Sequence, residues 1–286
     1  MYFGFKNISI EYGRKQILSN LSLEIPKSRV VTLIGRNGCG KSSLLKTIPR
    51  AVIPKTGSAV LDGIELRKYP PKQLARRIAY LAQVHTSPPD IDVRTLVSYG
   101  RYPYLKFGGS LTKEDGRIID NAIELTGLSA LREQTVSTLS GGERQRAWIA
   151  MTVAQQPEIL ILDEPTTYLD ISYQIEVLEL VRQLNRELGI TILMVLHDLN
   201  LACRYSDLLY AIRDGRLYLS GTPDELMTSE NLRELFGIEA EIVYDKINGC
   251  PFFIPLGQSS HERKTTAEAT AVKTSSIIKP ATEKVG

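Results

Sequence analysis

The chain has 286 residues, of which 43% are hydrophobic and 23% charged, and it is long enough to bury a substantial core in one large domain or two small ones. Its formal net charge of +3 is too small to indicate binding to a nucleic-acid backbone by charge alone. Three cysteines, Cys39, Cys203 and Cys250, have no metal-ligand spacing. An odd number of cysteines without a disulfide framework predicts a reducing compartment.

The hydropathy pattern also bears on the relation of the chain to a membrane. Residues 1–6 lack the basic and then apolar order of a signal peptide. No apolar run approaches the roughly 18 residues that a helix needs to cross a bilayer. We therefore expect any role at a membrane to depend on a partner protein.

Short strands and turns are predicted for residues 1 to about 30, where Ile8 and Ile10 alternate with polar residues. Residues 58–66 are predicted to form a hairpin around Asp62-Gly63. The N-terminal part of the chain is therefore predicted to contain short strands and a hairpin.

A phosphate-binding loop lies between these two segments. Residues 35–42 fit the pattern G-x-x-x-x-G-K-[ST], after the apolar run 30–34 and before a helical pattern over 43–48. The glycines allow backbone N–H groups to converge on a β-phosphate, Lys41 can reach the β- and γ-phosphates, and the Ser42 hydroxyl can bind Mg²⁺. The simplest interpretation of Cys39 is a small residue that fits the loop.

Amphipathic helices are predicted next, over 93–99, 114–126 and 142–155. The last of these follows Leu139-Ser140-Gly141-Gly142-Glu143. A serine and two glycines at the start of a helix supply a hydroxyl, N–H groups and the positive end of a dipole, which together favour a phosphate. Because one nucleotide needs only one such loop, the second element is a phosphate-binding feature beyond what a single nucleotide site requires.

From residue 158 the chain alternates strands and helices. Apolar runs at 159–162 and 191–196 flank a helix predicted over 175–188, a pattern typical of a parallel sheet covered on both faces. Asp163-Glu164 and His197 follow these two strands, where ligands bind in such sheets. Asp163 can hold Mg²⁺ directly or through water, Glu164 can polarise an attacking water, and His197 can contact a γ-phosphate.

The C-terminal tail, residues 258–286, has no aromatic residue and is rich in Ser, Thr, Ala, Lys and Glu. We expect it to be disordered, because too little apolar area is available to offset the chain entropy. A short interaction motif around Ile277-Ile278 is the alternative.

With these elements in this order, residues 2 to about 255 resemble the ATP-binding subunits of ABC transporters. The resemblance implies an α/β fold, a P-loop NTPase core with a mostly parallel sheet, an N-terminal antiparallel β subdomain and an inserted helical subdomain that carries the signature. It also implies an ATP-binding domain over 1–238 (core 1–84 and 158–238, helical subdomain about 85–157). A short C-terminal β extension over 239–257 and the tail would follow.

The same resemblance assigns roles to side chains. Tyr12 is expected to stack on adenine, Gln83 to touch Mg²⁺ and the membrane partner, and Leu169-Asp170 to form a dimer loop. The residues expected to bind ATP are Tyr12, Gly35, Arg36, Asn37, Gly38, Cys39, Gly40, Lys41, Ser42, Ser43, Gln83, Ser140, Gly141, Gly142 and Asp163. The expected Mg²⁺ ligands are Ser42, Gln83 and Asp163, and the expected catalytic residues are Glu164, His197 and Lys41.

Three positions depart from the family pattern: Glu143 replaces a frequent Gln, Arg36 a common Pro, and Ser28 a usual Gly. None of them removes a phosphate or metal ligand. Hydrolysis of ATP is therefore expected.

In this family, the signature of one subunit closes over ATP on the phosphate loop of the other. The resemblance thus implies a dimer of two copies, transmembrane permease subunits, an extracytoplasmic binding protein and a peripheral position on the cytoplasmic face of the membrane. Residues 99–104, 144–151 and 195–200 are most similar to the importers of iron(III)-siderophores. Residues 99–104 are expected to lie near the surface that receives the permease.

Several alternatives share part of this pattern. Importers of haem and vitamin B12 have the same architecture. A soluble ABC ATPase that acts on nucleic acid or ribosomes usually has two cassettes, a coiled-coil insert or zinc ligands, which this chain lacks, so no nucleic-acid partner is expected. A nucleotide-gated scaffold is disfavoured because Lys41, Asp163, Glu164 and His197 are all present.

Overall fold

The computed structural model describes residues 1–84, 88, 90–106 and 109–259. The predicted disordered tail lies outside the described residues from position 260 onward, and Gln258 is the last residue of a strand.

A six-stranded sheet forms the centre of the molecule, in the order β10-β9-β3-β8-β7-β6. Its strands are parallel except β10, which pairs antiparallel with β9. The strand bounds are β3 Val30–Ile34, β6 Ile78–Leu81, β7 Ile159–Asp163, β8 Thr191–Val195, β9 Leu208–Arg213 and β10 Arg216–Gly221.

An antiparallel sheet covers one face of this centre, in the order β2-β1-β4-β5. Its strands are β1 Phe3–Tyr12, β2 Lys15–Ile25, β4 Thr56–Leu61 and β5 Ile64–Glu65. The predicted hairpin is confirmed: β4 and β5 pair antiparallel, and Asp62 and Gly63 both have the positive φ of a tight turn.

Helices cover the sheet and extend beyond it. The α-helices are α1 Lys41–Leu45, α2 Pro71–Arg77, α3 Val93–Ser98, α4 Lys113–Leu125, α5 Gly141–Ala154, α6 Ile171–Leu188, α7 Leu199–Tyr205, α8 Pro223–Leu226 and α9 Ser229–Phe236. The 3₁₀ helices are η1 Leu66–Lys68, η2 Tyr99–Tyr104, η3 Ser129–Leu131 and η4 Val136–Thr138. A hairpin of β11 (Ile238–Asp245) and β12 (Cys250–Gln258) follows α9.

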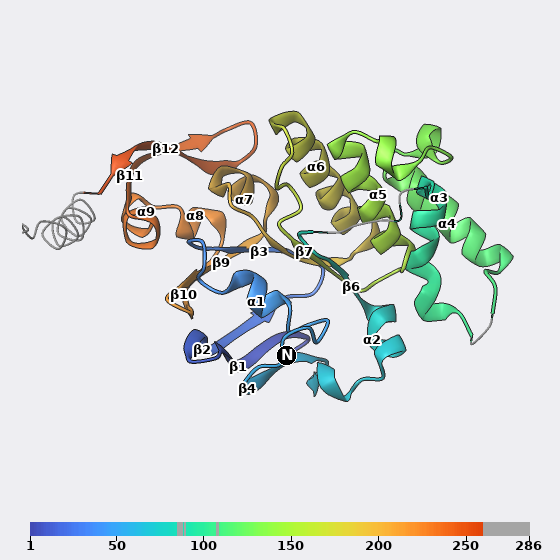
Figure 1. The fold of residues 1–286 in the computed structure, drawn as a ribbon. Helices are drawn as coiled ribbons and strands as arrows, with labels where there is room; N and C mark the ends of the chain where they lie inside the picture. The colour runs from blue at the N-terminus through green and yellow to red at the C-terminus, as the bar shows by residue number, and fades with distance from the viewer. Residues whose placement is uncertain (85–87, 89, 107–108, 260–286) are drawn as a thin grey trace, which may run out of the picture.

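Central strands are buried on both faces, as their sequence predicts. Along β7, Ile159 and Ile161 pack into the core shared with α1 and the antiparallel sheet, whereas Leu160 and Leu162 pack into the core shared with α5, α6 and α7. Figure 1 shows α1 and β1 on one side of β3 and β7, with α6 and α7 on the other. Because every residue of β7 and β8 is buried, only the strand ends can present polar side chains.

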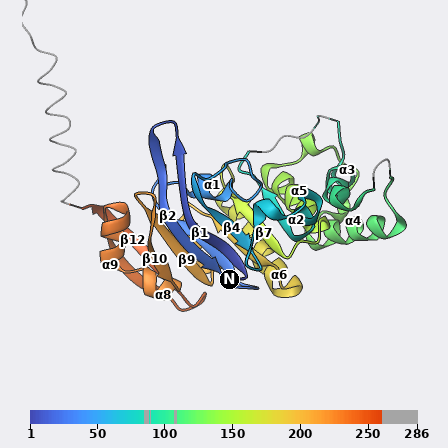
Figure 2. The ribbon, with the colours of Figure 1, turned by 90° about the horizontal axis from the view of Figure 1, so that it is seen from below.

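The helices α3, α4 and α5 lie together at one end of the molecule, within the range 85–157 (Figures 1 and 2). The hairpin β11–β12 lies at the other end, next to α7 and α8 (Figure 1). Within the described residues, no helix is long and apolar enough to cross a membrane.

Two helix starts differ from the sequence predictions by two residues or more. Helix α6 begins at Ile171 rather than at 175, because Asp170 takes the extended conformation of an N-cap. No residue of its first turn is buried, and Ile171 is exposed, so this turn adds nothing to a buried apolar face. Helix α1 begins at Lys41 rather than at 43, inside the phosphate-loop motif itself.

Candidate nucleotide site

The phosphate loop connects β3 to α1 and encloses the lysine side chain that it carries. Lys41 is only 5% exposed, and its Nζ donates to the carbonyl oxygens of Gly35 at 2.7 Å and Arg36 at 3.2 Å. Its Nζ also lies 3.7 Å from the Cys39 Sγ. The ammonium is therefore held beneath the backbone that would surround a phosphate.

Asp163 ends β7 directly beside the start of α1. Ser42 Oγ donates to Asp163 Oδ1 at 3.0 Å, and Tyr80 Oη donates to Asp163 Oδ2 at 3.2 Å. Asp163 is 2% exposed, and burial raises the pKa of its carboxyl, against the opposite effect of the bonds from Ser42 and Tyr80. Burial, and then the charge of Asp163, raise the pKa of Tyr80, which therefore remains a hydrogen-bond donor at neutral pH.

Glu164 is the point at which three segments converge. Its Oε1 lies 2.7 Å from His197 Nε2, after β8, and its Oε2 accepts from Gln83 Nε2 at 2.6 Å, after β6. Thr167 Oγ1 also donates to Glu164 Oε2, at 3.0 Å. The three strands are adjacent and parallel, so their carboxyl ends bring these side chains to one edge of the sheet.

The backbone of Glu164 is left-handed, with φ of +56°. Such a conformation is rare for residues other than glycine and asparagine and is found at functional sites. It occurs where the chain leaves β7 and turns back through the Thr167 amide, which donates to the Glu164 carbonyl oxygen at 3.3 Å.

A cleft of about 460 Å³ joins the loop to this edge. Its lining consists of Lys15, Ile17, Asn37, Gly38, Gly40, Lys41, Ser42, Ser43, Gln83, Glu164 and His197. Tyr12 lies next to it, half-exposed, with its Oη 3.4 Å from Ser43 Oγ. Arg36 and Cys39 line an adjoining cleft of about 530 Å³, which shares Asn37 and Gly38.

The donor set around Asp163 fits a magnesium ion. Among the residues that the structure describes, no group of three or more His, Cys, Asp or Glu side chains is placed to hold a metal. Mg²⁺, however, needs only one or two carboxylates when phosphates and waters complete its shell. The Ser42 hydroxyl and the Asp163 carboxylate are hard oxygen donors of this kind, and they lie in contact.

The predicted signature starts α5 and does not line the cleft. Ser140 is the N-cap: its Oγ accepts from the Glu143 N–H at 3.3 Å, and its own N–H donates to Glu143 Oε2 at 2.9 Å. Hydrogen bonds from Ser140 lower the pKa of Glu143. Glu143, which stands where the family frequently has Gln, thus completes a capping box, and its negative charge also suits the positive end of the helix.

Close packing requires glycine at one signature position. A Cβ on Gly142 would lie 2.3 Å from the ring of Tyr173, on α6. A Cβ on Gly141 would meet only Leu169, at 3.3 Å. The start of α5 therefore packs closely against the segment that follows Glu164.

Sequence reasoning missed four residues of the site: Lys15, Ile17, Tyr80 and Thr167. Tyr80 could have been found from its strand, because it precedes Gln83 and pairs with Ile161, two residues before Asp163. Lys15 and Ile17 carry no local signal for a nucleotide cleft.

The chain is similar to several known proteins. The family model described as ABC transporter matches residues 18–167. The ferric enterobactin transport ATP-binding protein FepC of Escherichia coli is 46% identical over 89% of this chain and 94% of its own length. The petrobactin import ATP-binding protein FpuD of Bacillus anthracis is 45% identical over 92% and 97%.

Two solved structures have the same fold. A transporter assigned to the metal-chelate type, in an inward-facing conformation, gives a TM-score of 0.77 at 25% identity over 89% of this chain and 97% of its own. The ATP-binding cassette MJ0796, solved as a dimer in a post-hydrolysis state with ADP and phosphate, gives 0.65 at 26% identity over 77% and 98%.

Proposed function

This chain belongs to the ABC transporter family, as an ATP-binding subunit with ATPase function, and from this premise we propose that it powers the import of an iron(III)-siderophore complex. The relatives that support this cargo are named for ferric enterobactin and petrobactin transport, and each aligns over nearly its whole length. Haem and vitamin B12 importers are the alternative cargo classes.

The observation that carries the catalytic part of the proposal is the convergence on Glu164. Glu164 serves as the general base for the attacking water, and His197 and Gln83 hold its two oxygens. Lys41 neutralises the β- and γ-phosphates from within the loop. Positioning and charge neutralisation of this kind account for most of the catalysis of phosphoryl transfer.

The remaining nucleotide contacts follow from the cleft. Ser42 and Asp163 would hold Mg²⁺, with Gln83 completing the protein ligands, and the ion would supply charge stabilisation at the phosphates. The phosphate-loop residues from Gly35 to Ser43 bind the phosphates, and the half-exposed Tyr12 ring stacks on adenine.

A second copy of the chain completes the site. Ser140, Gly141 and Gly142 do not line the cleft of their own chain, and they start a helix whose positive end favours a phosphate. We infer that they contact the γ-phosphate held by the partner copy, so that ATP joins two chains. The dimeric cassette with bound ADP and phosphate supports this arrangement.

The permease would bind at the junction of the core and the helical subdomain, near Tyr99 and Tyr102, whose rings lie 5.0 Å apart. Tyr102 is 56% exposed, which suits a contact surface. The ATP-binding domain would span 1–238, at the cytoplasmic face of the membrane, and an extracytoplasmic protein would deliver the cargo.

The test is transport in a reconstituted system. The chain is co-purified with the permease encoded beside it and placed in liposomes with the cognate binding protein, and uptake of iron(III)-siderophores, haem and vitamin B12 is compared. ATP-dependent accumulation of iron(III)-siderophore alone is expected, and the Glu164→Gln variant serves as the inactive control. Uptake of haem or vitamin B12 instead would overturn the cargo assignment while leaving the ATPase assignment intact.

A further inference from the structure

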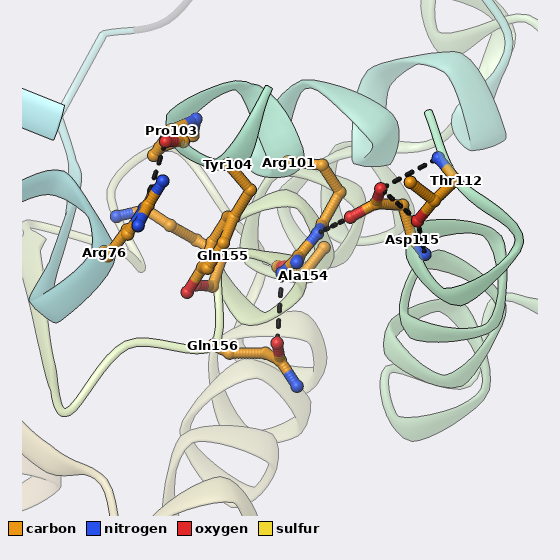
Figure 3. Close-up of polar contacts among 9 residues, drawn as sticks. All are labelled: Arg76, Arg101, Pro103, Tyr104, Thr112, Asp115, Ala154, Gln155 and Gln156. Atoms are coloured by element: carbon orange, nitrogen blue, oxygen red, sulfur yellow. Dashed lines mark hydrogen bonds and ion pairs between the residues drawn. The ribbon is translucent and has the colours of Figure 1, made fainter. Parts of the chain in front are cut away.

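A polar cluster with Arg101 and Asp115 buried at its centre joins the C-terminal end of α5 to α2 and α4, far along the chain from the phosphate loop. Figure 3 shows its members, which we call the Arg101 cluster: Arg76, Arg101, Tyr104, Asp115 and the backbone and side chains at residues 154–156. None of these residues lines the nucleotide cleft.

Arg101 lies at the centre and is only 4% exposed. Its Nε donates to Asp115 Oδ1 at 2.8 Å, and its Nη1 donates to the Ala154 carbonyl oxygen at 2.8 Å and to Gln156 Oε1 at 3.1 Å (Figure 3). A planar guanidinium can satisfy acceptors in several directions at once, which the single ammonium of lysine cannot do in the same geometry.

Asp115 is itself fixed at the start of α4. Its carboxylate accepts from the Thr112 N–H at 2.9 Å and from the Thr112 hydroxyl at 2.6 Å. Its own N–H donates to Thr112 Oγ1 at 3.1 Å, which with the bond from the Thr112 N–H forms a capping box. These bonds and Arg101 lower the pKa of Asp115 to about 2, so the ion pair is fully charged at neutral pH. Arg101 therefore ties the first turn of α4 to the last turn of α5.

Tyr104 extends the cluster to α2. Its ring lies between two guanidinium groups, with Arg101 Cζ at 3.8 Å and Arg76 Cζ at 4.9 Å from the ring centroid (Figure 3). Its hydroxyl donates to the Gln155 carbonyl oxygen at 3.0 Å, and Arg76 Nε donates to the Pro103 carbonyl oxygen at 3.1 Å. Cation–π contacts of this kind strengthen when they are removed from water.

Gln155 connects the same end of α5 to a strand of the central sheet. Its Nε2 donates to the carbonyl oxygens of Ala75 and Ile78, the latter at 2.9 Å. Ile78 starts β6, which ends two residues before Gln83. The backbone of η2 also lies directly on α5, because a Cβ on Gly100 would lie 2.1 Å from the Met151 carbonyl oxygen.

The two ends of α5 therefore have different roles. Its N-terminus carries Ser140, Gly141 and Gly142, and its C-terminus is held by Arg101 and Gln155. With 14 residues it is about 21 Å long at the usual rise of an α-helix. A small change of angle at the held end moves the signature end by a larger distance.

We propose that Arg101 is a positioning residue for ATP hydrolysis, which sets the angle of α5 and thereby the place of the signature over the nucleotide of the second copy. This inference rests on the composite site of the proposed function. Arg101 does not line the nucleotide cleft, and its effect is confined to the step in which two ATP-loaded copies close.

The experiment separates nucleotide binding from closure. Arg101→Lys is introduced into the full-length Glu164→Gln chain, so that ATP is bound and not consumed. Calorimetry at low protein concentration gives the ATP affinity of the single chain, and size-exclusion chromatography with light scattering gives the ATP concentration at which half the chain is dimeric.

The expected result is an affinity within about twofold of the parent and a dimerisation midpoint raised by about tenfold, since charge-assisted bonds at the held end are lost. Tyr104→Phe, which removes only the bond to the Gln155 carbonyl oxygen, is expected to raise the midpoint by about threefold. If Arg101→Lys does not fold, the dimerisation midpoint of Tyr104→Phe tests the proposal instead.

The matched control is Arg94→Lys, which weakens another ion pair of the helical subdomain, to Asp120 at 3.1 Å, without touching the end of α5. It is expected to leave both readouts unchanged. An unchanged midpoint in Arg101→Lys and Tyr104→Phe, or a parallel loss of ATP affinity, would overturn the proposal, even if thermal stability falls.

A second comparison tests the premise. Ser140→Arg is expected to abolish ATP-driven dimerisation with ATP affinity unchanged. If Ser140→Arg dimerises normally, the composite site is wrong and the role of Arg101 falls with it. If Ser140→Arg blocks closure and Arg101→Lys does not affect it, only the role of Arg101 is overturned.

Discussion

Two helix N-termini in this molecule are suited to phosphate, and they are built in opposite ways. Helix α1 starts at Gly40 in a left-handed conformation, and no side chain of the described residues caps it. Helix α5 starts at Ser140 with a complete capping box and an acidic side chain in its first turn. The first leaves its N–H groups open, whereas the second has one of them occupied by the Ser140 hydroxyl.

Their surroundings differ as well. Around α1 the same chain supplies an ammonium, a carboxylate pair and a histidine, whereas the start of α5 packs on Tyr173 and Leu169 and does not line the nucleotide cleft. The difference teaches that α1 belongs to a site almost complete in one copy. In the proposed composite site, the start of α5 is instead a preformed surface that contacts a phosphate only when another copy approaches.

The largest expected effect is on the rate of ATP hydrolysis in the cleft at the start of α1. Glu164→Gln should reduce the rate of ATP hydrolysis at least about 100-fold, because an amide cannot accept the proton of the attacking water. ATP affinity, measured by calorimetry, should be retained. Glu187→Gln, on the exposed end of α6, is the matched control, and hydrolysis at nearly the native rate in Glu164→Gln would remove Glu164 from its proposed role.

Lys41→Ala tests the loop that precedes α1. Loss of a buried ammonium aimed at the phosphates should weaken ATP binding by at least about tenfold, since hydrogen bonds to charged groups are worth about 1.5–3 kcal/mol. Lys6→Ala, on the exposed side of β1, should bind ATP like the parent. Equal affinity of the two variants in calorimetry would show that Lys41 does not bind the phosphates.

Gly142→Ala tests the start of α5. The added methyl group would overlap the Tyr173 ring and push α5 from α6, so ATP-driven dimerisation should weaken by about tenfold while ATP affinity stays constant. The double variant Gly142→Ala, Tyr173→Ala should recover part of the loss, because the overlap is removed. If ATP affinity fell as much as dimerisation, the start of α5 would not act separately from the nucleotide site at α1.

The smallest expected effect is on the stability of the fold at low pH. The folded-state pKa of Glu143 is lowered below its usual 4.5 by its bonds with Ser140. Its contribution to stability is therefore present above pH 4.5 and is lost as the pH falls through the lower, folded value. In chemical denaturation, the free energy of unfolding of Glu143→Gln should fall less between pH 4.5 and the lower folded-state pKa than that of the parent, by a few tenths of a kcal/mol. An identical pH dependence in the two proteins would contradict the capping role.

The sequence was sufficient for the parts of the molecule that depend on local pattern. The buried strands β7 and β8 follow from uninterrupted apolar runs, and the parallel-strand rule puts Glu164 and His197 at the same edge, where the structure has them 2.7 Å apart. The phosphate loop was visible because its glycines and Lys41 are adjacent in the chain. Tyr12 and Gln83 were predicted from the family resemblance alone.

Other features depend on contacts between distant segments. Tyr80 reaches Asp163 across 83 positions, and Thr167 bonds to Glu164 only because the chain turns back on itself. Arg101 carries a charge in a polar-looking segment, yet it is among the most buried polar residues. Nothing local distinguishes it from a solvated arginine, because its acceptors come from α4 and from the end of α5.

The left-handed backbone at Glu164 has a consequence for the stability of the fold. An L-residue with a side chain in this conformation is about 1–2 kcal/mol less favourable than in a right-handed one, and glycine avoids most of that cost. A chain selected only for stability would have glycine there. The protein instead has a carboxylate at a position where its own backbone disfavours one. In the proposed mechanism this carboxylate is the general base, so part of the folding free energy is given up for catalysis.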